Sequence, residues 1–183
     1  MAELKPNEKV YPLLKAADLS IREHVLSKNL FNTESNDLPI VVYALNDEKN
    51  YQILSKYEEG LDVDDIHTQA LTNLCEEPYA IEKLNEYSLT ASGNDFSSEL
   101  ILCPDFLMKA QASLNAEKII VSVPRRTVIY AGASNMPEEE FRKFLYLSIY
   151  TYQDNSFGNE VISDTFLEFE NGKLVSKFTL RKN

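Results

Sequence analysis

The chain has 183 residues, of which 44% are hydrophobic and 26% are charged. This length fits one domain with a sizeable core, and the composition is ordinary for a soluble globular protein. The formal net charge of −11 argues against non-specific binding to DNA or RNA, because phosphate contacts need clustered lysine and arginine. Such acidity permits a basic protein partner or a metal ion, although solubility alone explains it.

The cysteines and the absence of long apolar runs predict a cytoplasmic protein without membrane contact. Cys75 and Cys103 are too few for a disulfide framework in a chain of this size. Each lies in an apolar context, which predicts buried free thiols and a reducing compartment. The segment 1–6 has no apolar core and is not a secretory signal, and no run approaches the roughly 18 apolar residues of a membrane span.

The beginning of the chain is expected to be helical. Residues 1–9 are polar and contain a proline, which predicts a loose lead-in before a single domain over residues 10–183. Apolar side chains recur at helical spacing between Tyr11 and Leu30. They are Leu14, Ala17, Ile21 and Val25.

A β-hairpin and a second helix are predicted next. The apolar, β-branched run from Leu38 to Leu45 indicates a strand, and residues 51–54 indicate an antiparallel partner. Residues 62–75 are expected to form a helix capped by Asp64 or Asp65. Its predicted buried face consists of Ile66, Ala70, Leu71 and Leu74.

In the middle of the chain, Pro104 is expected to separate two helical segments. Residues 77–95 allow a short helix followed by a strand. The helical pattern from Phe96 to Leu114 contains Pro104, so we expect one short segment to end before it and a new helix to begin there. Ser97 is expected to cap the first of these segments.

A second hairpin should place two strands at the centre of a sheet. Residues 119–123 and 127–131 are rich in β-branched side chains, which is typical of buried central strands. Arg125 and Arg126 lie in the connection and form the one compact basic tip of an acidic chain. This tip is interpreted as a solvated turn, or alternatively as a docking point for a carboxylate, a phosphate or an acidic partner.

The third helix is expected to begin at Asn135. Glu138 lies three residues further on, at capping-box spacing, and Pro137 fits an early helical position. The face predicted to pack against the rest of the protein comprises Phe141, Leu145, Ser148, Ile149 and Tyr152.

The chain ends in a hairpin that turns at Asn171-Gly172, a pair that tolerates the positive φ angles of a type I′ turn. This turn pairs Phe169 with Leu174. One face should then carry Leu167, Phe169, Leu174, Phe178 and Leu180. The basic side chains of the last strand are expected to face solvent on an edge strand of the sheet. Because strands arrive as consecutive hairpins, the predicted fold is α+β, with a largely antiparallel sheet covered by helices.

Several short motifs occur in a recognisable order along residues 8–183. They are Tyr11-Pro12-Leu13-Leu14-Lys15, the strands within 40–54, Ser97-Ser98-Glu99-Leu100-Ile101-Leu102 followed by Phe106-Leu107, Val121-Ser122-Val123-Pro124-Arg125-Arg126, and the tail 166–180. In this order the chain resembles the domain-of-unknown-function family 1444, the YtpQ-like bacterial proteins. It departs from that family at Thr127, where an acid is frequent, and in lacking an extra N-terminal region. The resemblance implies a fold and no established activity.

Asp62, Asp64, Asp65 and His67 form the most metal-like cluster, since carboxylates and an imidazole can hold a divalent ion. Metal-assisted hydrolysis at this cluster is therefore one alternative function. No EF-hand glycine or HExxH motif supports it, and acidic residues at a helix start need only the helix dipole to explain them. No motif surrounds a serine or cysteine nucleophile either, and no cofactor is predicted.

Tyr146 and Tyr150 lie four residues apart on the third predicted helix. Tyrosine is frequent at protein interfaces, although it also packs well at the edge of a core, and core packing is the favoured interpretation. The leading functional hypothesis is a non-catalytic protein-binding domain, for example an inhibitor or immunity-like factor, whose partner is basic. Its candidate contacts are Arg125, Arg126, Tyr146 and Tyr150. A small-ligand pocket between sheet and helices is a further alternative.

Overall fold

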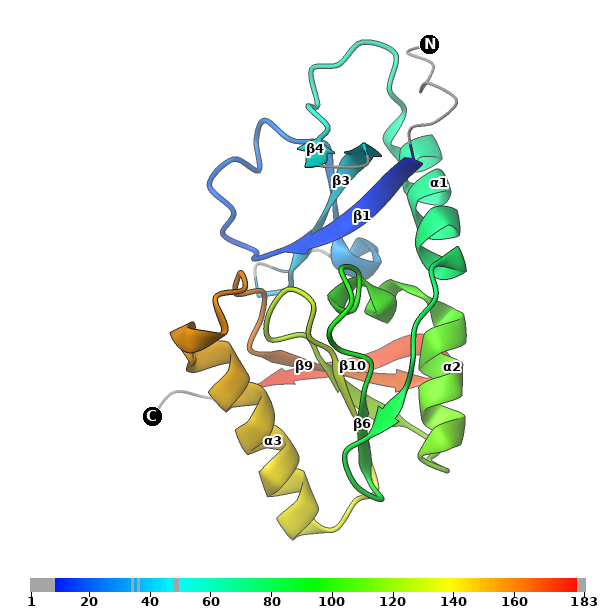
Figure 1. Ribbon diagram of the computed structural model, residues 1–183, viewed down its shortest axis with the longest axis vertical. Coiled ribbons are helices and arrows are strands. Elements are labelled where there is room, and N and C mark those ends of the chain that lie inside the picture. Colours follow the sequence, from blue (N-terminus) through cyan, green and yellow to red (C-terminus); the bar gives the residue numbers. More distant parts are fainter. Residues whose placement is uncertain (1–8, 34, 36, 48–49, 181–183) are drawn as a thin grey trace. The chain divides into compact units, whose positions relative to one another are not determined.

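The computed structural model describes residues 9–33, 35, 37–47 and 50–180 (Figure 1). Within them the chain forms three α-helices and two antiparallel sheets, so the predicted α+β class is confirmed. The chain divides into two compact units, Met1–Glu77 and Pro78–Asn183, each of which is described by itself. The single domain over 10–183 stays a prediction, and the predicted lead-in at 1–9 lies outside the described residues except for Lys9.

The first unit is built on strand β3 (Ile40–Asp47). It pairs antiparallel with β1 (Lys9–Lys15) along one side, and with β2 (Ser27–Asn29) and β4 (Asn50–Ile53) along the other. The predicted β3–β4 hairpin is therefore confirmed. Residues 48–49, between the two strands, lie outside the described part of the chain.

The helix predicted between Tyr11 and Leu30 is wrong. The segment instead contains β1, a stretch of turns, β2 and the short 3₁₀ segment η1 (Leu30–Asn32). Val10 to Leu14 are all buried, so β1 is covered on both faces. A strand of that kind shows a continuous apolar run, which periodicity alone does not distinguish from a buried helix.

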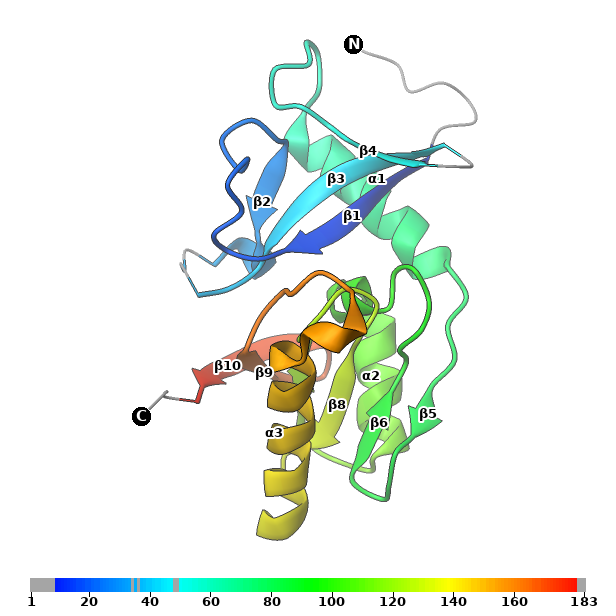
Figure 2. The ribbon, with the colours of Figure 1, turned by 60° about the vertical axis from the view of Figure 1, so that its left-hand side comes forward.

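Helix α1 (Val63–Glu76) packs on β1 (Figure 2). Its N-cap is Asp62, whose side chain accepts hydrogen bonds from the backbone N–H groups of Asp64 and Asp65. The cap therefore lies earlier than predicted, and the two aspartates occupy the first turn, where negative charge is favourable. Ile66, Ala70 and Leu74 are buried as expected, while Leu71 is half-buried.

The second unit contains a six-stranded sheet with the order β10-β9-β7-β8-β6-β5. Its strands are β5 (Glu82–Lys83), β6 (Ser88–Thr90), β7 (Ile119–Ser122), β8 (Tyr130–Ala133), β9 (Thr165–Glu170) and β10 (Lys173–Thr179). The prediction that the second hairpin is central is confirmed, because β7 and β8 occupy the middle. Within residues 77–95 the predicted strand is present as β6, whereas the predicted short helix is replaced by β5 and turns.

The helices of this unit lie on opposite sides of the sheet, with α3 on one and α2 on the other (Figures 1 and 2). As predicted, a 3₁₀ segment η2 (Ser98–Leu102) ends before Pro104, which opens α2 (Pro104–Ser113). Two predicted caps are wrong. Ser97 accepts from the backbone N–H of Asn94 and does not cap η2, and α3 (Glu138–Gln153) follows Pro137 without a side-chain cap.

The contact between α3 and the sheet is centred on Phe144, which joins Ile120, Tyr130 and Phe166 in one buried cluster. Gly132 on β8 allows this close approach, since a Cβ there would lie 2.5 Å from Met136 Cε and 3.2 Å from the Phe144 ring. The buried residues of α3 are Phe144, Ser148 and Thr151. The predicted face is confirmed in part, because Ser148 is buried and Phe141, Leu145 and Ile149 pack partly buried against the same cluster. The prediction did not include Phe144 and Thr151.

The C-terminal hairpin turns as predicted, with positive φ at Asn171 and Gly172 and with Phe169 opposite Leu174. A β-bulge between Leu174 and Ser176 then shifts the register by one residue. Phe178 consequently lies opposite Phe166, with stacked rings 5.1 Å apart. The predicted face shared by Leu167, Phe169 and Phe178 is therefore wrong, because one extra residue moves Phe178 to the other side of the sheet.

Candidate functional site

The acidic cluster at the start of α1 does not converge on one point. Asp62 caps the helix, Asp64 accepts a hydrogen bond from Lys28 Nζ, and His67 Nδ1 lies 2.8 Å from the Tyr43 hydroxyl. Among the residues that the structure describes, no group of three or more His, Cys, Asp or Glu side chains is placed to hold a metal ion. The metal-assisted alternative thus has no assembled site there.

Burial and two nearby charges set the pKa of His67. Burial lowers the pKa of His67, the nearby Lys28 charge lowers it further, and Asp64 opposes both effects. The hydrogen bond from Lys28 lowers the pKa of Asp64, whereas burial raises the pKa of the Tyr43 hydroxyl. The Tyr43 hydroxyl and His67 Nδ1 share a hydrogen bond, so the pair joins α1 to β3 as a structural contact.

Both cysteines are disulfide-bonded, so the prediction of free thiols is wrong. Cys103 is buried as expected, while Cys75 is exposed. The predicted reducing compartment depended on free thiols, and the cytoplasmic location stays a prediction. In the described part of the chain, no helix is long and apolar enough to cross a membrane.

Arg125 is buried, with 2% of its surface exposed, so the predicted solvated tip is wrong for this residue. Its Nε donates to the Thr151 carbonyl at 2.6 Å, and its Nη2 donates to the Tyr152 carbonyl at 2.9 Å. Nη1 donates to the Asn159 carbonyl at 2.7 Å. Arg125 therefore closes the C-terminal end of α3, where the last carbonyls have no partners within the helix and a positive charge is favourable.

Arg126 is half-buried beside it. Its backbone N–H donates to the Glu160 carbonyl, and its own carbonyl accepts from Asn159 Nδ2. The connection between β7 and β8 is thus fastened to the segment that follows α3. A role of these arginines in partner binding stays a prediction, and the Arg125 guanidinium is used within the unit.

Tyr146 and Tyr150 form the most prominent aromatic surface of α3. Their side chains are 70% and 50% exposed, and their rings stack with centroids 6.0 Å apart at 21°. The favoured interpretation as core packing is therefore wrong. Neither tyrosine belongs to the predicted inner face, and the buried side of α3 is centred on Phe144, Ser148 and Thr151, which leaves this pair on the outside.

The Tyr150 hydroxyl donates a hydrogen bond to Asp154, the C-cap residue of α3. The hydrogen bond to Asp154 raises the pKa of Tyr150, while hydrogen bonds from Ser156 and then from Tyr150 lower the pKa of Asp154. Asp154 therefore remains an anion beside the stacked rings. Asp154 is not among the predicted contact residues, although its spacing of four residues from Tyr150 on the same helix face indicates such a pair.

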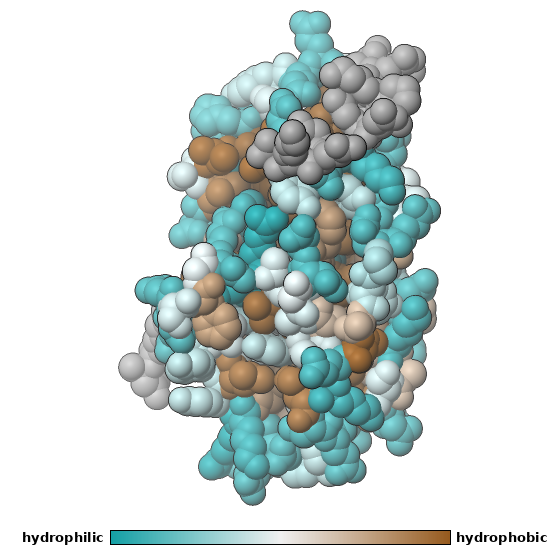
Figure 3. All heavy atoms as spheres, in the orientation of Figure 1, coloured by the Kyte–Doolittle hydropathy of each residue, from teal (hydrophilic) through white to brown (hydrophobic). Residues whose placement is uncertain are grey.

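The other end of the same surface is also acidic. Glu138 pairs with Arg142, and Glu139 and Glu140 both pair with Lys143. Three carboxylates thus meet two basic groups on the first turns of α3. Figure 3 shows mainly hydrophilic side chains where α3 begins, at the bottom of the view. We name the exposed side of α3 from Glu138 to Asp154 the α3 outer face.

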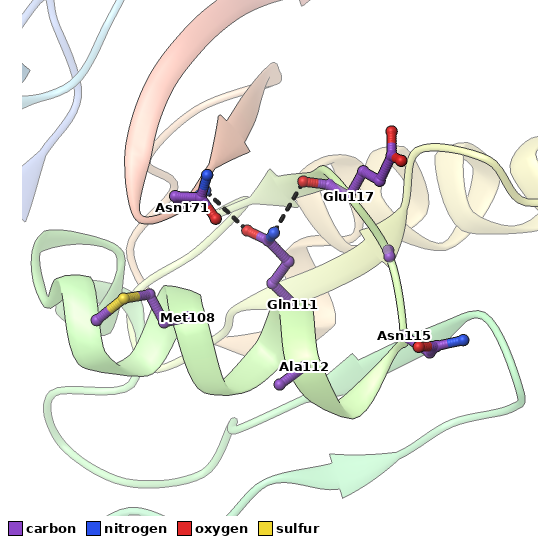
Figure 4. Close-up of a pocket in the computed structure, with 7 residues that line it drawn as sticks. Met108, Gln111, Ala112, Asn115, Glu117 and Asn171 are labelled. Atoms are coloured by element: carbon purple, nitrogen blue, oxygen red, sulfur yellow. Dashed lines mark hydrogen bonds between the residues drawn. The ribbon is translucent and has the colours of Figure 1, made fainter.

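A separate open hollow of about 560 Å³ lies at the end of α2 (Figure 4). It is lined by Met108, Gln111, Ala112, Asn115, Ala116, Glu117 and Asn171. Gln111 is used internally, because it accepts from the Asn171 N–H and donates to the Glu117 carbonyl. The Asn115 and Glu117 side chains point away from Gln111 (Figure 4), so the lining does not converge on a ligand.

Comparison of the chain with family models, curated proteins and solved structures finds no significant match. The resemblance to the domain-of-unknown-function family 1444 stays a prediction. The α3 outer face is therefore put forward as the candidate site on geometry and charge alone.

Proposed function

We propose that the protein is a non-catalytic binding domain that docks a protein partner on the α3 outer face, as an inhibitor or immunity-like factor does. The observation that carries this proposal is the exposed, stacked pair Tyr146 and Tyr150. Large aromatic side chains lose apolar surface to a partner at a small cost in conformational entropy, which makes them frequent anchors of interfaces.

The placement of the pair on a helix supports this role. Phe144, Ser148 and Thr151 fix the opposite side of α3 in the core, and Arg125 fixes its C-terminal end. The tyrosines are therefore presented on a rigid element and are already stacked before a partner arrives. Preorganisation of this kind reduces the entropy lost on binding.

The overall charge supports a basic partner. Residues 1–77 carry 15 acidic and 7 basic side chains, and residues 78–183 carry 14 and 11. Both parts of the chain are therefore negative, and the first part strongly so. Long-range attraction between such a chain and a basic protein accelerates their encounter and weakens as salt is added.

A capture experiment tests the proposal. The purified full chain, the double variant Tyr146→Ala/Tyr150→Ala and the variant Tyr57→Ala are immobilised and exposed to lysate of the source cells at several salt concentrations. Tyr57 is the matched control because it is 67% exposed and lies in the first unit. We expect a specific protein to be retained by the wild type and by Tyr57→Ala, and to be lost from the double variant.

Circular dichroism and thermal melting establish that each variant is folded. Retention of the same proteins by all three chains would contradict the proposal, since it would locate the binding surface elsewhere. Retention of none at low salt would count against a protein-binding function altogether.

A further inference from the structure

Two other tyrosines of this chain, Tyr57 and Tyr79, have a lysine of the same chain over the ring, whereas Tyr146 and Tyr150 do not within the residues that the structure describes. Lys56 Nζ lies 5.3 Å from the ring centroid of Tyr57, and Lys109 Nζ lies 5.2 Å from that of Tyr79. In the described part of the chain, no lysine or arginine covers Tyr146 or Tyr150 in this way. Their outer surfaces are therefore open to a cation from another molecule.

The electrostatics at both ends of the pair favour such a cation. The Tyr150 hydroxyl donates a hydrogen bond to the Asp154 carboxylate, which increases the electron density of the phenol ring and places a negative charge beside it. On the α3 outer face, Glu138, Glu139, Glu140 and Asp154 outnumber the two basic side chains Arg142 and Lys143. An arriving positive charge thus meets two π faces and an excess of negative charge.

We infer that the partner places an arginine side chain on the Tyr146–Tyr150 pair. A guanidinium is planar, stacks on aromatic rings and donates several hydrogen bonds in the plane of the stack. The Asp154 carboxylate accepts a hydrogen bond from the Tyr150 hydroxyl, and its remaining lone pairs can accept a further bond from a guanidinium. A lysine ammonium would meet the same rings without stacking, which makes arginine the better fit. This inference rests on the proposed function and names the chemistry of its partner.

A peptide titration tests the inference. The full chain is titrated with acetyl-Gly-Arg-Gly-Arg-Gly-amide, with the same peptide containing lysine, and with the same peptide containing uncharged citrulline. The ring signals of Tyr146 and Tyr150 are followed by NMR, with assignments from single Tyr→Phe variants. We expect the arginine peptide to shift both signals and to bind most tightly, and the citrulline peptide to bind at least about ten-fold more weakly.

Variants separate this site from general attraction to an acidic protein. Tyr146→Ala/Tyr150→Ala should weaken binding of the arginine peptide about five- to twenty-fold, since each exposed ring contributes a few-fold. Asp154→Asn should weaken it by a smaller factor, and Tyr57→Ala should leave it unchanged. Ring signals that do not move, or equal binding of the citrulline peptide, would overturn the inference.

The outcomes also separate this inference from the proposed function. If the lysate partner is lost from the double variant while the arginine peptide leaves the rings unaffected, the binding face stands and the arginine inference fails. If both experiments are negative, both ideas fail. Ring shifts that depend on protein concentration without peptide would identify a second copy of the chain as the occupant, and would overturn the arginine inference.

Discussion

Replacement of Arg125 by methionine gives the sharpest test of the fold around the candidate site. Arg125→Met keeps an unbranched apolar stem of similar length and removes the guanidinium that donates to the carbonyls of Thr151, Tyr152 and Asn159. The first two carbonyls belong to the last turn of α3, where no helical N–H reaches them. The variant therefore leaves the end of the helix uncapped.

The expected magnitude follows from these contacts. Hydrogen bonds to a charged donor contribute about 1.5–3 kcal/mol each. Asn159 is exposed, so its carbonyl can turn to water, and we count only the two contacts to α3. Because the variant also removes the cost of burying a charge, we expect a net loss of about 3 kcal/mol in the free energy of unfolding. In a chain of this size that loss lowers Tm by about 6–12 °C.

The assay is urea and thermal unfolding followed by circular dichroism, with Arg142→Met as the control. Arg142 lies on the same helix and makes one exposed ion pair with Glu138. Its loss should change the free energy of unfolding by less than about 1 kcal/mol. If Arg125→Met is as stable as the control variant, the guanidinium does not support α3 and the reasoning is refuted.

Three further predictions concern other parts of the chain. Gly132→Ala should cost about 1–3 kcal/mol in urea unfolding, because the added methyl group meets Met136 and Phe144; an unchanged midpoint would mean that both side chains yield freely. Because the pKa of His67 is lowered in the folded state, the unfolded chain binds a proton first, so the contribution of His67 is present above about pH 6.5 and lost as the pH falls below that value. His67→Asn should flatten this part of the stability profile, and parallel profiles would refute the assignment. Since both cysteines are disulfide-bonded, thiol titration of the unfolded, unreduced chain should find no free thiol, and reduction should cost about 2–4 kcal/mol.

Local signals in the sequence were sufficient for much of the fold. The Asn171-Gly172 turn, the restart at Pro104 and the helix after Asp62 are each dictated by the conformational limits of a few neighbouring residues. The first strand was missed because β1 is buried on both faces, and the spacing of its apolar residues then carries no period of two. The bulge after Leu174 has no sequence signal, since its extra residue is an ordinary valine.

The candidate site was harder to predict, because it depends on which way α3 faces. Ser148 and Thr151 are buried although they are polar, since their hydroxyls donate to the carbonyls of Phe144 and Leu147 within the same helix. Ser148 was on the predicted face, whereas Thr151 was missed, because a pattern of hydrophobicity does not show that a hydroxyl group is satisfied within its own helix. The burial of Arg125 could not be predicted from the sequence either, because its acceptors lie at a helix end 26 and 27 residues further along the chain.

The bulge in β10 also affects how the chain behaves at high concentration. β10 is the outermost strand of its sheet, and a regular edge strand invites other chains to add to it and aggregate. The extra residue at Val175 breaks the even spacing of the outward backbone groups, and Lys173 and Lys177 place positive charges along the same strand. A foreign strand therefore finds no long, uniform edge to extend. The exposed aromatic rings of α3 therefore occur together with an edge strand, β10, whose bulge and charges disfavour fibril growth.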